Sequence, residues 1–158
     1  MKRNNARFDI LPFPSAATEP GRIVAIDPGA KRVGVAISDE LRVAVRPLPA
    51  IPRGNWKQLL RAVTEVIESF AARALVIGLP LRLDGTEGAS AAAARELAAK
   101  FRFSLRIPVY LQDERLTTFA ARENLKEEGH GKREIGKLLD SESAAIILRD
   151  FLAAANAD

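Results

Sequence analysis

The strongest constraint on the fold is an amphipathic helix pattern that leads directly into a wholly apolar segment. Apolar residues recur at steps of three and four from Trp56 to Phe70, which is typical of a helix that covers a sheet with one face. The next run, Ala74 to Gly78, is apolar throughout, as expected of a parallel strand buried on both faces. This succession predicts an α/β domain.

Further strands and helices are predicted on both sides of that unit. Three short strands precede the helix, at about residues 23–27, 33–37 and 41–45, and their closeness in sequence indicates an antiparallel meander. After residue 78 come a helix, a strand and two more helices, at about residues 89–101, 107–111, 117–126 and 141–154. The expected order is therefore βββαβαβαα.

The composition agrees with one small domain. A chain of 158 residues with 47% hydrophobic content can bury one sizeable core, which we place in residues 21–158. Residues 1–20 contain three prolines and no sustained period, so we interpret them as a flexible extension. Without cysteine, neither a disulfide nor a thiolate metal site can form. No segment is apolar for long enough to span a membrane, so we expect a cytoplasmic protein.

The charge balance is compatible with a polyanionic partner. The chain has 24 Lys and Arg against 20 Asp and Glu, giving a net charge of +4 and an isoelectric point near 9.8. Many proteins with other functions are equally basic, so this balance alone does not identify the partner.

Acidic residues follow the predicted strands at one edge of the sheet. Asp27 ends the first strand, and Asp113 and Glu114 follow the last strand. Reactive groups gather outside the carboxyl ends of parallel strands, so these acids should converge. Asp140 precedes Ala144 by four residues, which places it on the buried face of the last helix and predicts that it points toward the sheet.

Three inward carboxylates would repel one another unless a divalent cation neutralised them. With only oxygen ligands, no cysteine and a single histidine, the site favours Mg²⁺ or Mn²⁺. Two such ions about 3.5–4 Å apart could activate a water and stabilise the leaving oxygen of a phosphodiester. The acids therefore predict hydrolytic phosphoryl transfer, and of the adjacent pair Asp113 and Glu114, which face opposite ways on an extended segment, we favour Glu114 as the metal ligand.

Each acid also has an ordinary structural interpretation. Asp27 could belong to a simple turn with Pro28 and Gly29, and Asp140 could be the N-cap of the last helix. The cluster at residues 113–115 could be a solvated surface. We favour a metal site because it explains all three placements at once.

Four motifs resemble the YqgF/RuvX family, and the resemblance extends from Gly21 to Leu152. They are IVAIDPGAKRVGVAISD, VIGLPLRLDGTEG, QDERLTT and GKREIGKLLDSESAAIILRDFL. The resemblance implies a ribonuclease H-like fold, with a mixed five-stranded sheet of three antiparallel and then two parallel strands, flanked by helices. It also implies a hydrolase acting on ester bonds, a nuclease that matures the 5′ end of precursor 16S rRNA or, in some members, acts in junction resolution. Carried over by motif, the family acids are Asp27, Glu114 and Asp140.

Substrate contacts are expected around these acids. Gly78 and Thr86 belong to a loop that could hold a phosphate before a helix, although a plain turn with an N-cap at Thr86 or Ser90 is the alternative. The predicted basic contacts are Lys31, Arg32, Arg115, Lys132, Arg133 and Lys137. The lone His130 beside the last group is given no catalytic role. The expected partner is nucleic acid, either precursor 16S rRNA or branched DNA.

Two rival functions stay open. Actin-like ATPases begin with a similar Asp-x-Gly hairpin, but they need two such domains and this chain accounts for one. A non-catalytic RNA- or junction-binding module would keep the fold and the basic loop while using the acids structurally. The sequence does not separate RNA ends from branched DNA as substrate, nor a monomer from a homodimer.

Overall fold

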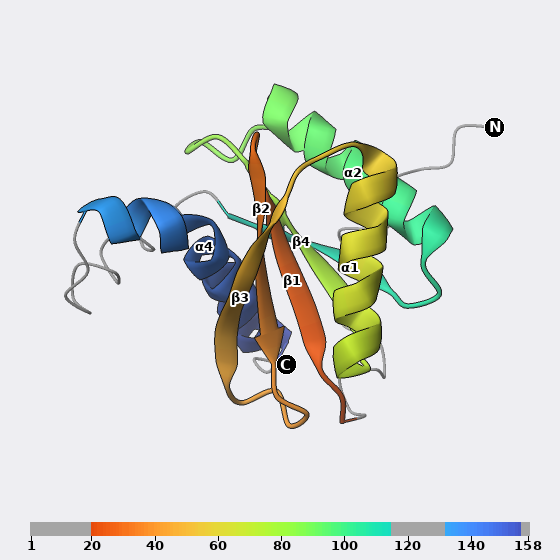
Figure 1. The fold of residues 1–158 in the computed structure, drawn as a ribbon. Coiled ribbons are helices and arrows are strands. Elements are labelled where there is room, and N and C mark those ends of the chain that lie inside the picture. The colour runs from red at the N-terminus through yellow and green to blue at the C-terminus, as the bar shows by residue number, and fades with distance from the viewer. Residues whose placement is uncertain (1–19, 115–131, 156–158) are drawn as a thin grey trace.

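A computed structural model describes residues 20–114 and 132–155, the latter as backbone only up to residue 140. Its elements are β1 (Ile23–Pro28), β2 (Arg32–Ser38), β3 (Val45–Pro52), α1 (Trp56–Phe70), β4 (Ala74–Leu79), α2 (Ala89–Ser104), β5 (Val109–Asp113) and α4 (Lys132–Ala155) (Figure 1). The predicted order is confirmed for these elements. The helix expected at residues 117–126 and the extension at residues 1–19 lie outside the described residues.

The five strands form one mixed sheet in the order β3-β2-β1-β4-β5. β1 pairs antiparallel with β2, which pairs antiparallel with β3, whereas β4 runs parallel to both β1 and β5. This is the predicted arrangement of three antiparallel strands followed by two parallel ones. It brings the carboxyl ends of β1, β4 and β5 to one edge of the sheet.

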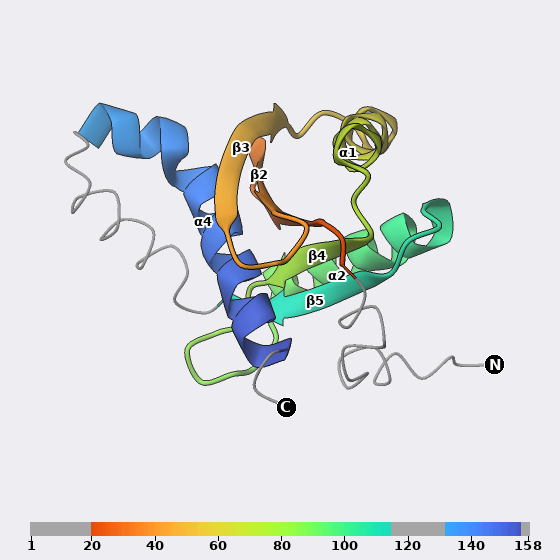
Figure 2. The same ribbon diagram turned by 90° about the horizontal axis from the view of Figure 1, so that it is seen from below.

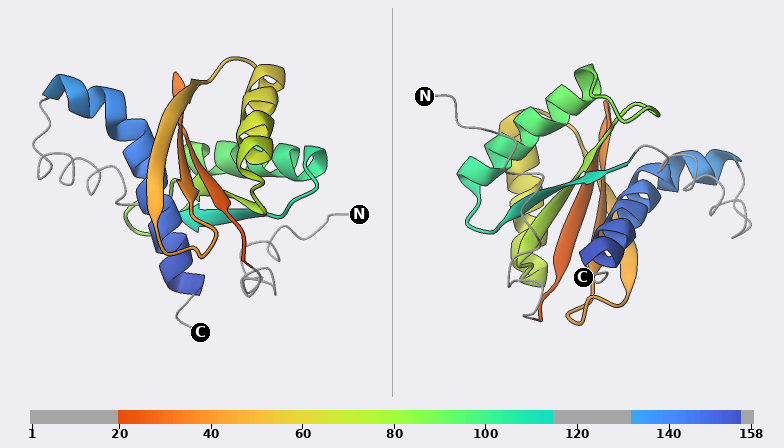
Figure 3. Two further views of the ribbon diagram at one scale, coloured as in Figure 1. Left: turned by 60° about the horizontal axis from the view of Figure 1, so that its bottom comes forward. Right: turned by 180° about the vertical axis from the view of Figure 1, so that it is seen from behind.

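Helices cover both faces of the sheet. α1 and α2 lie on one face and α4 lies on the other (Figures 2 and 3). Successive strand residues alternate between these layers, so Val24 and Ile26 pack toward α1 and α2, and Ile23 and Ala25 pack toward α4. Because both faces are covered, β4 and the first four residues of β1 are apolar without a break.

The third strand differs from the prediction. It begins at Val45, and the expected strand residues Leu41 and Val43 are 76% and 82% exposed. The reason is a turn in which the Asp39 carboxylate accepts hydrogen bonds from the backbone N–H groups of Val43 (2.8 Å) and Ala44 (3.1 Å). The alternation of apolar and polar residues at 41–45 is therefore part of a turn and not of a strand up to Val45.

The last helix also differs from the prediction, because α4 begins at Lys132 and not near Ser141. Residues 132–140 are mostly good helix formers, and the single glycine at position 136 costs only about 1 kcal/mol. Asp140 is therefore inside the helix, which excludes its interpretation as an N-cap. Among the described residues, no helix is long and apolar enough to cross a membrane.

Polar contacts hold α4 on the antiparallel half of the sheet. The register of β2 and β3 shifts between Val33 and Val35, and the Ser141 hydroxyl bridges this bulge. It accepts a hydrogen bond from the N–H of Val35 (3.4 Å) and donates one to the carbonyl of Leu48 (2.6 Å).

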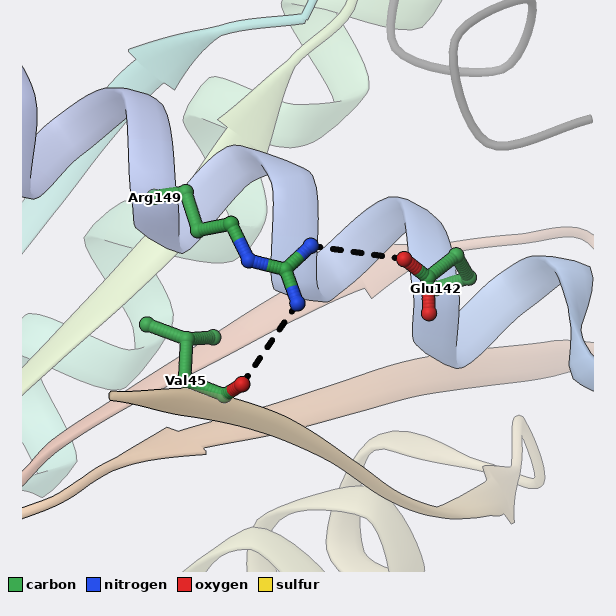
Figure 4. A network of polar contacts seen from close by, with 3 residues as sticks. All are labelled: Val45, Glu142 and Arg149. Carbon is green, nitrogen blue, oxygen red and sulfur yellow. Dashed lines mark hydrogen bonds and ion pairs between the residues drawn. The ribbon is translucent and has the colours of Figure 1, made fainter. Parts of the chain in front are cut away.

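Further along α4, an ion pair adds a second attachment to the edge strand. Arg149 pairs with the buried Glu142 at 3.3 Å and donates to the carbonyl of Val45 at 3.4 Å (Figure 4). A buried carboxylate without a partner would be costly, so Arg149 both satisfies Glu142 and ties the helix to β3. Together with Ser141, these contacts set the position of the part of α4 that follows Asp140.

Candidate active site

Asp27 lies near the end of β1, at the edge where the parallel strands end. It pairs with Gly34 of β2, and the preceding pair joins Ile26 to Ile77 of β4, so Gly78 is its neighbour on β4. The alternation of β1 directs Asp27 to the face covered by α4, the face shared by Ile23 and Ala25. Asp27 is half-buried.

Glu114 reaches the same point from β5. Its backbone N–H donates to the carbonyl of Leu79 at 3.1 Å, which continues the pairing of β5 with β4 beyond Asp113. Its carboxyl group lies against Gly78, because a Cβ placed on that glycine would be 2.8 Å from the Glu114 Oε2 atom. The side chain also hydrogen-bonds to Asp27. Acids from β1 and β5 thus meet across β4, over a residue with no side chain.

The electrostatics of this acid pair are unfavourable without a counter-charge. Burial of the carboxyl group is the largest effect that raises the pKa of Glu114, followed by repulsion from Asp27, the hydrogen bond with Asp27 and repulsion from Asp113; together they raise it to about 9. At neutral pH, Glu114 therefore carries a proton that it shares with Asp27.

This chemistry fits a hard divalent cation. Carboxylate oxygens are the ligands that Mg²⁺ and Mn²⁺ prefer, and a cation between Asp27 and Glu114 would replace the shared proton. Asp140, the third predicted ligand, is one turn before Ala144 in α4, and its side chain lies outside the described residues. Residues 20–114 and 141–155 contain no cluster of three or more His, Asp or Glu side chains close enough together to hold a metal ion. The proposed site has two described acids, and the third stays a prediction.

The predicted basic contacts are placed unevenly. Lys31 and Arg32 are exposed in and after the turn between β1 and β2, two and three residues beyond Gly29. Arg115 lies outside the described residues. For Lys132, Arg133 and Lys137 the structure describes only the backbone. Lys132 and Arg133 nevertheless begin α4 and do not belong to the predicted loop.

The loop between β4 and α2 shows a turn where a phosphate site was predicted. The Asp84 carboxylate accepts hydrogen bonds from the Thr86 N–H (2.9 Å) and hydroxyl (2.7 Å), an ordinary turn contact. The N-cap of α2 is Gly88, without a side-chain cap, so the alternative of a cap at Thr86 or Ser90 is wrong. Phosphate binding by Thr86 stays a prediction.

Arg53 is a site residue that the sequence did not indicate. Pairing of β2 with β3 brings it to the β1–β2 turn, where its N–H donates to the carbonyl of Lys31 and its Nη1 donates to the carbonyl of Gly29, both at 3.0 Å. It also lines a cleft of about 240 Å³ that includes Gly78. Only the register of two strands places Arg53 here, and that register is not readable from the local sequence.

Comparison with known proteins identifies the family. Residues 21–154 match the family RuvX, described as Holliday junction resolvase. The chain belongs to the RuvX family. It is 39% identical over 132 residues to a protein of Koribacter versatilis, covering 84% of this chain and 86% of that one. It is also 39% identical over 134 residues to a protein of Maridesulfovibrio salexigens, covering 85% and 99%. Both carry the provisional name pre-16S rRNA nuclease.

The fold of the RuvX chain is shared with solved resolvase structures. The Thermus thermophilus RuvC in complex with a Holliday junction substrate has a TM-score of 0.52 and 18% identity, with 85% of this chain and 95% of that chain covered. The fowlpox virus Holliday junction resolvase has a TM-score of 0.53 and 12% identity, with 84% and 99% covered. At these identities the likeness concerns the fold, and it confirms the predicted ribonuclease H-like architecture. The predicted class, a hydrolase of nucleic-acid ester bonds, is confirmed at the level of the family.

Proposed function

We propose that this RuvX chain is a divalent-metal-dependent nuclease that processes the 5′ end of precursor 16S rRNA. The observation that supports it best is that the carboxyl groups of Asp27 and Glu114 meet over Gly78. Both are half-buried, and a bound cation would offset their mutual repulsion. The names of the relatives from Koribacter versatilis and Maridesulfovibrio salexigens support the choice of substrate. The place of action that follows from this substrate is the cytoplasm.

The residues of the chain have separate tasks in this proposal. Asp27 and Glu114 would hold Mg²⁺ or Mn²⁺ at the sheet edge, and Asp140 would supply a third carboxylate from α4. A cation bound there would supply the Lewis-acid chemistry that lowers the pKa of an attacking water and offsets the charge on a leaving oxygen. Lys31 and Arg32 hold the phosphate backbone near the acids, and phosphate contacts of this kind provide affinity and not sequence preference.

The same acid pair would serve a second function, cleavage of branched DNA. The family description and the resolvase folds favour this candidate. A four-way junction is symmetric and requires two active sites for paired cuts, whereas one RNA end requires only one. Any test of substrate choice should therefore also measure the mass of each protein–substrate complex, which shows whether one or two copies of the protein bind.

The test is cleavage of two labelled substrates, a 5′ leader of precursor 16S rRNA and a four-way DNA junction, in Mg²⁺, in Mn²⁺ and in EDTA. We expect cutting of the leader in either metal and none in EDTA. Preferential cutting of the junction would favour the second candidate. Binding of both substrates without metal-dependent cutting would contradict the nuclease proposal and favour a binding module.

A further inference from the structure

A cleft beside the acid pair has no assigned role. It lies at the same edge of the sheet and has a volume of about 240 Å³. The β1–β2 turn forms one wall, through Pro28, Gly29 and Ala30, and the first turns of α2 form the other, through Ser90 and Ala94. Gly78 lines this cleft on the side of α2, and its other side lies against the Glu114 carboxyl and Ile147 of α4, so only this glycine backbone of β4 separates the cleft from the acid pair.

Arg53 provides the only charged side chain among the described residues that line this cleft. One guanidinium nitrogen, Nη1, is held by the Gly29 carbonyl at 3.0 Å, and the backbone of Arg53 is held by Lys31. Within residues 20–114 and 141–155, no acidic side chain pairs with Arg53. The side chain is half-buried, so the guanidinium is fixed in place while part of its charge stays available to a ligand.

A fixed guanidinium beside a phosphodiester-cleaving centre matches the chemistry of a phosphate. Its planar set of donors suits phosphate oxygens, and the neighbouring small residues, Gly29, Ala30 and Gly78, allow a polymer backbone to approach closely. The carboxylates cannot attract this anion themselves, so the positive charge must come from outside the pair. Arg53 supplies it from the opposite face of the sheet edge.

We propose that the cleft between the β1–β2 turn and α2 holds the substrate strand next to the scissile bond, with Arg53 binding one of its phosphates. This inference rests on the proposed nuclease function, because it takes the same nucleic acid as ligand. In this proposal the nucleic-acid strand passes over the ends of β1 and β4, from the acid pair to the cleft. Arg53 thus sets which phosphate lies at the acids.

Binding is measured in EDTA, so that the result does not depend on cleavage. The probe is the labelled 5′ leader of precursor 16S rRNA, titrated with wild type, Arg53→Gln and the control Arg61→Gln, over a range of salt concentrations. Arg61 is exposed on α1 and is not among the residues that line the cleft. We expect Arg53→Gln to bind about tenfold more weakly and to lower the slope of log affinity against log salt by about one, with Arg61→Gln unchanged.

A purely structural role for Arg53 predicts a different result. Loss of the bond to Gly29 could disturb the turn after Asp27 and so weaken the metal site. Calorimetric titration of Mn²⁺ separates the two roles, and we expect equal Mn²⁺ affinity in wild type and Arg53→Gln. Reduced Mn²⁺ affinity with an unchanged salt slope would overturn the proposal in favour of positioning, and unchanged RNA affinity and slope would overturn it outright.

Failure of the nuclease proposal gives a distinct pattern. If wild type binds the leader but never cuts it in metal, the nuclease function fails while a weakened Arg53→Gln still supports the phosphate contact. If wild type cuts the leader and Arg53→Gln binds as well as wild type, the nuclease stands and the Arg53 inference fails. The two claims can therefore be judged separately.

Discussion

The carboxyl group of Glu114 lies directly against Gly78, in space that any side chain at position 78 would fill. A Cβ on Gly78 would be 2.8 Å from the Glu114 Oε2 atom and 2.7 Å from the Cδ1 atom of Ile147. Contacts under 3.0 Å require movement of one partner, and here Ile147 is fully buried while the half-buried Glu114 is hydrogen-bonded to Asp27. The absence of a side chain at Gly78 is therefore what allows Glu114 to reach Asp27.

The substitution Gly78→Ala should separate the acid pair. We expect Mn²⁺ affinity to fall by about tenfold or more, and overpacking against Ile147 to lower the free energy of unfolding by about 1–3 kcal/mol. Calorimetry and urea unfolding measure the two effects. The matched control is Gly88→Ala, whose Cβ would meet only the flexible end of Arg82 at 3.0 Å. Equal Mn²⁺ affinity in Gly78→Ala and wild type would contradict this role for Gly78.

The metal-free protein should lose stability as the pH rises. Glu114 has a pKa of about 9 in the folded protein, whereas an unfolded glutamate titrates near about 4.3. Between these values the folded state holds a proton that the unfolded chain has released, so the free energy of unfolding falls with increasing pH across this window. Urea unfolding in EDTA from pH 5 to pH 9 measures it, and Glu114→Gln should flatten the Glu114 part of the profile. Identical profiles for the two proteins would rule out a raised pKa at Glu114.

Divalent metal should reverse this pH dependence. A cation displaces the proton shared by Glu114 and Asp27, so metal affinity rises with pH and binding releases a proton. We expect Mn²⁺ to raise the melting temperature more at pH 8.5 than at pH 6, and calorimetry in two buffers of different ionisation enthalpy to detect the released proton. A shift that is equal at both pH values, without proton release, would place the metal elsewhere.

The Ser141 hydroxyl should contribute to the position of α4. It bridges the N–H of Val35 and the carbonyl of Leu48 at the bulge between β2 and β3. Ser141→Ala leaves the buried N–H of Val35 and the partly buried carbonyl of Leu48 without this partner, so we expect a loss of about 1–3 kcal/mol in the free energy of unfolding. Ser104→Ala, at the exposed end of α2, is the control and should change stability by less than about 0.5 kcal/mol. A loss for Ser141→Ala no larger than for the control would show that the bridge contributes nothing.

The sequence predicted the parts of the fold that depend on long periodic patterns. The helix at Trp56–Phe70 and the apolar strand at Ala74–Leu79 lie where their patterns indicated. The third strand was misplaced because the alternation at residues 41–45 looked like a strand, while the side-chain bonds of Asp39 close a turn there. Such bonds depend on geometry that hydrophobic periodicity does not report.

The candidate site was only partly predictable for the same reason. Asp27 and Glu114 could be selected because each lies at the end of a strand, and parallel strands bring their ends to one edge. The role of Gly78 as the space for a carboxyl group depends on side-chain packing, and Arg53 reaches the site only through the register of β2 and β3. Neither relationship has a local sequence signal.

The most direct test of the account is single-turnover cleavage of the precursor 16S 5′ leader by wild type and Asp27→Asn in Mn²⁺. The variant removes one charge from the acid pair and keeps the shape of the side chain. We predict that Asp27→Asn folds and binds the leader, while its cleavage rate falls by at least about a thousandfold. A variant that cuts the leader within about tenfold of the wild-type rate would contradict the proposed active site.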